Sequence, residues 1–120
     1  MKATIASLIF LLLSLAVSSQ TYKYIGIEEG LSNQKIYRIQ KDARGYMWFL
    51  THVGIDRYNG KEIKHYKLKE GDRELDPLLN INWTYLDKTG TLLVTGKQGR
   101  IFRYDSGHDR FVQIYSMYNY

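Results

Sequence analysis

The chain has 120 residues, a formal net charge of +5 and no cysteine. This length allows one small domain at most, and the absence of cysteine excludes a disulfide framework, cysteine-based zinc sites and a thiol-linked lipid anchor. Lysine and arginine are spread along the whole chain. This spread is typical of a solvated surface and not of the concentrated basic face of a nucleic-acid-binding protein.

Residues 1–19 have the pattern of a secretory signal peptide. Lys2 is followed by the apolar and small-residue run ATIASLIFLLLSLAV and then by SSQ, so cleavage after Ser18 or Ser19 would fit. The apolar run is shorter than the roughly 18 residues of a typical membrane span, which makes an uncleaved anchor the weaker interpretation. We therefore expect an exported protein that contacts a membrane only through this segment or through regions outside the chain.

The remainder of the chain holds two copies of one sequence unit. At a period of 45 residues, Asp42 pairs with Asp87, Gly45 with Gly90, Trp48 with Leu93 and Gly54 with Gly99. One residue is added after the third glycine, so Arg57-Tyr58 pairs with Arg103-Tyr104 at a period of 46. Several anchors that stay in register indicate an internal repeat.

Each copy is predicted to form four short antiparallel strands. The strands of the first copy are KIYRIQK, YMWFLTH, GIDRY and KEIKHYKL, and those of the second are NINWTYL, TLLVT, RIFRY and FVQIYSMY. Asp-x-x-Gly and Asn59-Gly60 provide the tight turns. The second strand of the first copy is apolar on both faces, and such a strand needs cover on both sides.

This pattern predicts an all-β protein with two four-stranded β-propeller blades. The blades span 35–68 and 80–120, joined by a loop over 69–79 and preceded by a lead-in strand and loop over 20–34. The lead-in strand is expected at residues 21–27, TYKYIGI. A closed propeller needs at least about four blades. We therefore expect an incomplete propeller from a longer or truncated chain, whose partners include the remaining blades.

Residues 28–66 resemble the two-component regulator propeller repeat. The residues that carry the resemblance are Gly30, Leu31, Ser32, Asn33, Asp42, Gly45, Met47-Trp48, Thr51, Gly54-Ile55 and Arg57-Tyr58. The second copy matches more loosely, because Leu93 replaces the tryptophan and Thr95 lies one place early.

The resemblance implies a function in signalling. Such propellers form the periplasmic sensor of membrane-spanning regulators in Bacteroides-type Gram-negative bacteria, and these sensors typically respond to oligosaccharides released from glycans. Many relatives are hybrid histidine kinases, others end in a helix-turn-helix domain, and the full-length proteins are expected to be dimeric. The chain contains no kinase motif, so we expect a non-catalytic sensing segment without a cofactor.

Loop residues at one end of the blades are the candidate ligand contacts. The loop that enters the first strand and the loop between the second and third strands share one face of a propeller, and polar loop residues on rigid strands often bind ligands. The candidates are Asn33, Gln34 and His52, with neighbouring Ser32, from the first blade and Asn80, Lys97 and Gln98 from the second.

The other conspicuous residues have structural interpretations. Trp48 is expected in the core, and Asp42 and Asp87 are expected in turns. His52, His65 and His108 lack metal-like spacing.

Two other classes of function stay open. A propeller enzyme would need paired carboxylates facing the central channel, and neither predicted innermost strand supplies one. A stand-alone exported β-protein could bind partners through its exposed edges.

Overall fold

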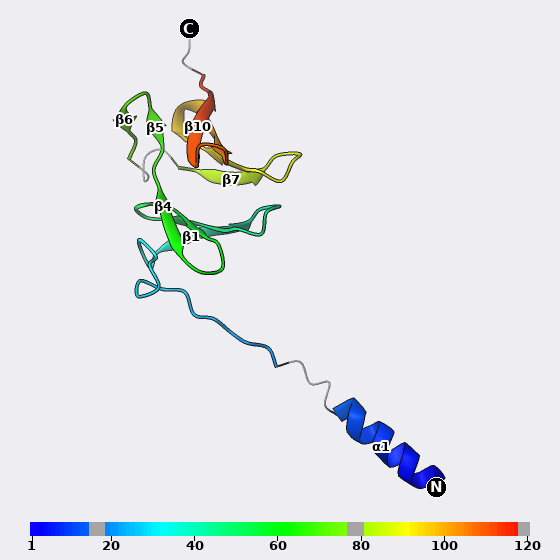
Figure 1. Ribbon diagram of the computed structural model, residues 1–120. Coiled ribbons are helices and arrows are strands. Elements are labelled where there is room, and N and C mark those ends of the chain that lie inside the picture. Colours follow the sequence, from blue (N-terminus) through cyan, green and yellow to red (C-terminus); the bar gives the residue numbers. More distant parts are fainter. Residues whose placement is uncertain (15–18, 77–80, 118–120) are drawn as a thin grey trace.

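The computed structural model describes residues 1–14, 19–76 and 81–117 of the chain. Helix α1 (Lys2–Ser14) projects away from two stacked four-stranded sheets (Figure 1). Within the described ranges, no helix is both long and apolar enough to cross a membrane.

Both sheets are antiparallel meanders, as the repeat predicts. Blade one has the order β1-β2-β3-β4, and blade two has the order β7-β8-β9-β10. The strands of blade one are β1 (Ile36–Lys41), β2 (Met47–Thr51), β3 (Gly54–Tyr58) and β4 (Ile63–Tyr66). Those of blade two are β7 (Trp83–Leu86), β8 (Leu92–Thr95), β9 (Ile101–Asp105) and β10 (Arg110–Tyr115). The all-β prediction is confirmed, and the arrangement is consistent with an incomplete propeller.

Two segments outside the blades differ from the expectation. The predicted lead-in strand at residues 21–27 does not form, because the structure gives this segment no strand partner and a strand needs a neighbour for its backbone hydrogen bonds. The connection predicted as a loop contains a small hairpin made of β5 (Lys69–Glu70) and β6 (Arg73–Glu74). A short 3-10 turn, η1 (Lys97–Gly99), lies between β8 and β9, where the second copy carries its extra residue.

The Asp-x-x-Gly turns begin the same way in both blades. In blade one, Asp42 Oδ1 accepts hydrogen bonds from the backbone N–H groups of Arg44 and Tyr46. In blade two, Asp87 Oδ1 accepts them from the N–H groups of Thr89 and Thr91. Both turn glycines have positive φ, +87° at Gly45 and +74° at Gly90, a conformation that a side chain would strain. The interpretation of the two aspartates as turn residues is confirmed.

The second oxygen of Asp42 connects the turn of blade one to the core. Trp48 Nε1 donates to Asp42 Oδ2 at 2.8 Å, and the Trp48 side chain is 0% exposed. The prediction that Trp48 is a core residue is therefore confirmed. The hydrogen bond satisfies the one polar atom that this large side chain would otherwise bury without a partner.

The two blades stack face to face with their corresponding strands and turns side by side. Innermost strand β1 lies against innermost strand β7, and Ala43 N–H in the first turn donates to the carbonyl of Gly90 in the second. The shared core takes Trp48, Leu50, Ile55 and Tyr66 from blade one and Leu92, Val94, Phe102, Tyr104 and Phe111 from blade two. The repeat partners of Trp48 and Ile55 are Leu93 and Ile101, and neither belongs to this core. Each blade thus uses a different face, which makes the contact heterologous and head-to-tail.

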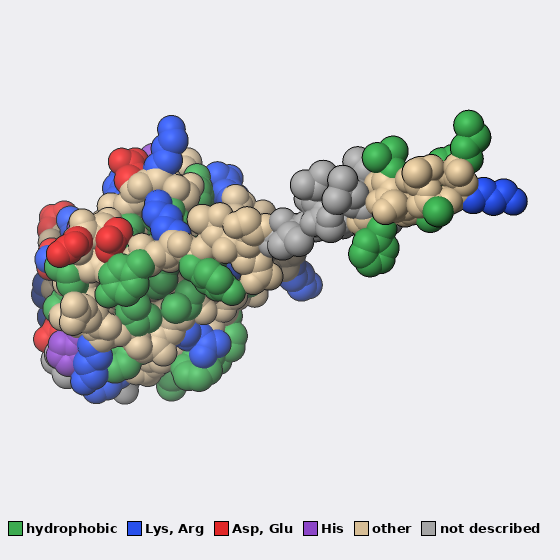
Figure 2. Space-filling model, turned by 90° about the horizontal axis from the view of Figure 1, so that it is seen from below, with side chains coloured by type: hydrophobic (Ala, Val, Ile, Leu, Met, Phe, Trp, Pro, Cys, Tyr) green, Lys and Arg blue, Asp and Glu red, His purple; other side chains and the backbone are tan. Residues whose placement is uncertain are grey.

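A head-to-tail contact leaves one face of each blade without a partner blade. On blade two, Val112 is 36% and Ile114 is 55% exposed. On blade one, Ile39 is exposed, while Leu31 is buried in the loop before β1. Figure 2, seen from below, shows hydrophobic side chains gathered on the sheets and on the projecting helix. Exposed apolar faces of this kind favour association with a further sheet.

A lysine on the open face of blade two should reduce self-association. We expect the chain to associate as its concentration rises and Ile114→Lys to shift it towards monomer, because burying the added charge would be costly. Sedimentation velocity across a concentration series measures this shift. Ser106→Lys adds the same charge at an exposed turn and should behave like the unaltered chain. A monomer at all concentrations would contradict the prediction.

Loss of the Trp48 hydrogen bond should destabilise the fold. Trp48→Phe keeps an aromatic ring but leaves the buried Asp42 carboxylate without its indole donor, so we expect a loss of about 2–4 kcal/mol in the free energy of unfolding. Trp83→Phe alters a half-exposed tryptophan and should cost less than about 0.5 kcal/mol. Urea unfolding followed by circular dichroism compares the two variants, and equal losses would contradict this role of Trp48.

Candidate functional site

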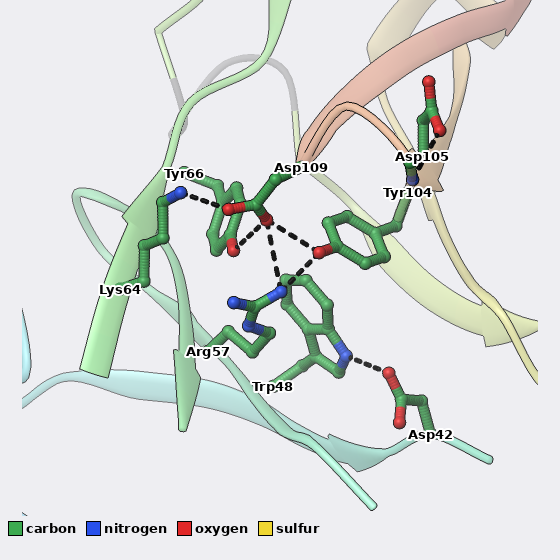
Figure 3. Close-up of polar contacts among 9 residues, drawn as sticks. Asp42, Trp48, Arg57, Lys64, Tyr66, Tyr104, Asp105 and Asp109 are labelled. Atoms are coloured by element: carbon green, nitrogen blue, oxygen red, sulfur yellow. Dashed lines mark hydrogen bonds and ion pairs between the residues drawn. The ribbon is translucent and has the colours of Figure 1, made fainter. Parts of the chain in front are cut away.

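The two blades are joined by an ion cluster at the end that carries the β9–β10 turn (Figure 3). Arg57 on β3 forms an ion pair with Asp109, with 3.2 Å between Arg57 Nη1 and Asp109 Oδ1. Lys64 on β4 pairs with the other carboxylate oxygen. The hydroxyl groups of Tyr66 and Tyr104 donate to Asp109 Oδ1 at 2.6 and 2.7 Å. One carboxylate of blade two therefore gathers two cations from blade one and one hydroxyl from each blade.

Aromatic rings enclose the guanidinium of Arg57. Its centre lies 4.5 Å from the Tyr46 ring centroid and 5.2 Å from that of Tyr66, and the side chain is only 12% exposed. Trp48 and Tyr104 also lie within cation–π range. Attraction of a cation to the faces of aromatic rings adds to the ion pair when water is excluded.

The cluster shifts the pKa values of its own members. Burial raises the pKa of Asp109, but hydrogen bonds from Lys64, Tyr66 and Tyr104 together with the charge of Arg57 outweigh it and hold the pKa below its usual range. Burial and the hydrogen bond to Asp109 raise the pKa of the Tyr66 hydroxyl. The pKa of Asp87 is also lowered, by hydrogen bonds from Thr89, Thr91 and Arg103. Asp109 and Asp87 are thus carboxylates that the fold keeps ionised.

A cleft of about 430 Å³ lies between the blades at the opposite end of the innermost strands. We call it the inner cleft. It is lined by Tyr37, Arg38, Leu50, Thr51, Ile81, Asn82 and Trp83. The volume is in the range of sites for small ligands, and the mixture of apolar, aromatic and a few polar groups is typical of them.

Arg38 is the central polar side chain of the inner cleft. Its Nε donates to Thr84 Oγ1 at 2.9 Å, and its guanidinium stacks 3.8 Å above the Trp83 ring. The hydrogen bond comes from β1 and ends on β7, so it also joins the two blades. The guanidinium of this arginine, which comes from β1, is therefore held in place by two groups of β7 on the other side of the cleft.

The predicted ligand residues of blade one lie next to the inner cleft but do not line it. His52 Nδ1 is hydrogen-bonded to the hydroxyl of Tyr37 at 2.5 Å, and Tyr37 is a lining residue. Asn33 Oδ1 accepts from the Lys35 backbone N–H. Gln34 is exposed in the same loop. These three residues form one neighbourhood around the start of β1.

The predicted ligand residues of blade two are elsewhere. Lys97 and Gln98 lie in η1 and border a separate hollow of about 540 Å³ beside residues 73–76. Asn80 lies outside the described residues. The structure therefore does not bring the candidates of the two blades together in one described pocket, and their role in ligand binding stays a prediction.

Sequence analysis did not identify Tyr37, Arg38, Asn82 or Trp83 as site residues. One signal was available in β1, where Arg38 and Gln40 alternate with Tyr37 and Ile39. The structure turns the polar pair inward and leaves Tyr37 56% and Ile39 52% exposed. An arginine at an inward position of an innermost strand could have been recognised as a candidate ligand contact.

A buried carboxylate next to a serine and a histidine does not form a catalytic triad. Asp56 is 1% exposed and accepts hydrogen bonds from Ser32 Oγ at 2.8 and 2.9 Å, while His65 Nδ1 lies 2.7 Å from its Oδ1. The carboxylate lies between the hydroxyl and the imidazole, whereas a triad needs the imidazole in the middle. In the part of the chain that the structure describes, no three His, Asp or Glu residues are grouped to hold a metal ion.

Replacing Asp109 should weaken the contact between the blades above pH 4. Asp109→Asn removes the charge that Arg57 and Lys64 face, so we expect a loss of about 1–3 kcal/mol in the free energy of unfolding at pH 7. Asp72→Asn, in the exposed turn between β5 and β6, is the matched control and should change stability little. Urea unfolding at pH 7 measures both changes.

The free energy of unfolding of Asp109→Asn should fall less steeply with decreasing pH than that of the unaltered chain. Folding lowers the pKa of Asp109 below its unfolded value of about 3.9, so the carboxylate stabilises the fold above that pH. This contribution is lost as the pH falls from about 4 towards the lower pKa of the folded state. The unaltered chain should therefore lose more stability over this range than Asp109→Asn. An equal loss of stability in the two proteins between pH 4 and lower pH would contradict the role of Asp109.

Comparison with known proteins identifies the repeat. No curated protein sequence matches the chain. The family model described as two component regulator propeller matches residues 30–52, which run from the loop before β1 through β2 to the turn that precedes β3. The match includes Asp42 and Gly45 of the turn, Trp48 of the core and Thr51 of the inner cleft. Residues 30–52 are therefore similar to the two component regulator propeller repeat.

Proposed function

We propose that the chain provides the first two blades of an exported, non-catalytic sensor propeller that responds to an oligosaccharide and signals through a two-component regulator. The observation that carries the proposal is the head-to-tail stack of two blades, the first of which contains the family repeat. A heterologous contact closes into a ring only when further units are added. Further blades of a longer chain would cover the open faces around Ile39 and Ile114.

The geometry of the site favours binding over catalysis. Strands β1 and β7, which border the inner cleft, carry no Asp or Glu, so they offer no acid/base pair for glycoside cleavage. Aromatic rings at a half-open cleft suit the apolar faces of sugar rings. Rigid strands that position polar side chains at their ends are a common scaffold for ligand binding. A sensor needs these properties and needs no reactive group.

Disruption of the apolar segment in α1 should block export. With Ile9→Arg, the charge interrupts the signal pattern, so we expect a full-length precursor in the cytoplasm. The unaltered product should be periplasmic and begin at Ser19 or Gln20. Ser106→Arg, with the same charge at an exposed turn, should be exported normally. N-terminal sequencing and cell fractionation measure these outcomes, and export of Ile9→Arg would contradict the signal-peptide assignment.

An immunoblot of the source cell separates the sensor from a stand-alone protein. We expect an antibody against residues 61–76 to detect a large band in the membrane fraction, because further blades and an output domain would belong to the same chain. A soluble band near 14.1 kDa or slightly smaller would instead support the second candidate, a stand-alone exported binding module. The exposed Val112 and Ile114 favour that candidate, because a free apolar face can also bind a partner.

A further inference from the structure

We propose that the inner cleft recognises an acidic oligosaccharide, with Arg38 binding a carboxylate on the sugar. This inference rests on the proposed oligosaccharide-sensing function and names the class of ligand. It is carried by the charge, the hydrogen bonds and the surroundings of a single arginine, considered against the other arginines of the chain.

Arg38 differs from the other partly buried arginines. Arg57 pairs with Asp109, Arg100 with Glu70 and Arg103 with Asp87. Arg38 is also partly buried, yet it forms no ion pair with any described carboxylate. Its Nε is taken by Thr84, whereas Nη1 and Nη2 have no acceptor among the described residues. A partly buried guanidinium is usually compensated by an anion, so an anionic ligand at the free edge would stabilise Arg38.

The surroundings of Arg38 are built to present that edge. Thr84 holds Nε and the Trp83 ring supports one face of the guanidinium, so the remaining two nitrogens keep a fixed direction. A fixed planar fork of two N–H donors matches the two oxygens of a carboxylate. Stacking on tryptophan also lowers the cost of taking the cation out of water.

Among the described residues, the lining of the cleft holds no charge that competes with Arg38. None of its seven lining residues is acidic, so no side chain in the lining repels an anion or neutralises Arg38. Lys35, whose Nζ lies 5.5 Å from the centroid of the Tyr37 ring, adds a second cation at the start of β1. A lining that holds the cation Arg38 and no carboxylate favours a negatively charged ligand over a neutral one.

The aromatic and polar lining indicates that the anion is part of a sugar. Tyr37 and Trp83 are 56% and 47% exposed, so ring surface is open to stacking. Asn82 provides an amide group that can exchange hydrogen bonds with sugar hydroxyls, whereas the hydroxyl of Thr51 is buried and already bonded to Gly54 and Ser32. A small inorganic anion would use the charge of Arg38 but would leave these rings uncovered. A uronic acid unit within an oligosaccharide matches both parts of the lining.

Calorimetry with two matched trisaccharides tests the inference on the full chain. The probes are trigalacturonate and the neutral galactose trisaccharide of the same linkage, which differ only in their carboxylates. We expect trigalacturonate to bind at least about tenfold more tightly, which corresponds to about 1.4 kcal/mol, and its affinity to fall as salt is added. Trigalacturonate should also quench the fluorescence of Trp83, and this quenching should disappear in Trp83→Phe.

Variants at Arg38 identify the group that makes the distinction. Arg38→Gln should lower the affinity for trigalacturonate about tenfold or more and leave that for the neutral trisaccharide within about threefold. Arg38→Lys keeps the charge but loses the two parallel N–H donors, so its affinity for trigalacturonate should lie between those of the unaltered chain and Arg38→Gln. Arg44→Gln removes an exposed arginine of the β1–β2 turn and is the matched control. Circular dichroism confirms that each variant is folded, and Arg38→Lys serves as the test if Arg38→Gln is not.

The outcomes separate this inference from the proposed function. Equal affinity for the two trisaccharides, or an unchanged preference in the Arg38 variants, would overturn the recognition of an acidic sugar and leave oligosaccharide sensing standing. Quenching of Trp83 fluorescence by neutral sugars and not by trigalacturonate would likewise overturn the recognition of an acidic sugar and leave oligosaccharide sensing standing. Failure of both trisaccharides and of a wider glycan panel to bind would count against the sensing function as well.

Discussion

The pairing of Arg57 with Asp109 is the interaction on which the arrangement of the two blades depends. It joins β3 of blade one to the β9–β10 turn of blade two, and the hydroxyls of Tyr66 and Tyr104 converge on the same carboxylate. Aromatic packing alone would bring the sheets together without defining their register, because hydrophobic attraction has no direction. A guanidinium enclosed by rings and facing one carboxylate has few alternative partners, so it selects one stacking geometry.

The two copies of the repeat use the same residue types in different ways. In blade one, Trp48 donates to the turn carboxylate Asp42, and its cross-strand neighbour Arg57 extends to blade two. In blade two, Leu93 has no donor to offer, and its cross-strand neighbour Arg103 turns back to Asp87 at 2.8 Å. The arginine of blade one thus contacts the next blade, whereas that of blade two contacts its own turn.

The stack places the ion cluster and the inner cleft at opposite ends of the strands. The ion cluster and the turn contact between Ala43 and Gly90 hold one end together. At the other end the sheets separate around the inner cleft, where the hydrogen bond from Arg38 to Thr84 is a polar link between β1 and β7. A ligand bound there would contact both blades at once. In the proposed sensor, binding at this position would alter the angle between neighbouring blades.

The sequence by itself determined the two meanders, the turns and the buried place of Trp48, because these depend on local turn chemistry and on alternation along single strands. It placed Asn33 and His52 in loops at one end of blade one, and the structure has them beside the inner cleft, where their role in binding stays a prediction. Only the tertiary structure decided that residues 21–27 form no strand, because a strand needs a neighbouring strand and local sequence does not show whether one lies beside it. It likewise decided the pairing of Arg57 with Asp109, 52 residues apart, and the placing of Lys97 and Gln98 beside a different hollow. The tertiary structure also decided that Arg38 is a cleft residue. The alternation along a strand predicts which residues share a face, but only the packing of the second blade shows what that face contacts.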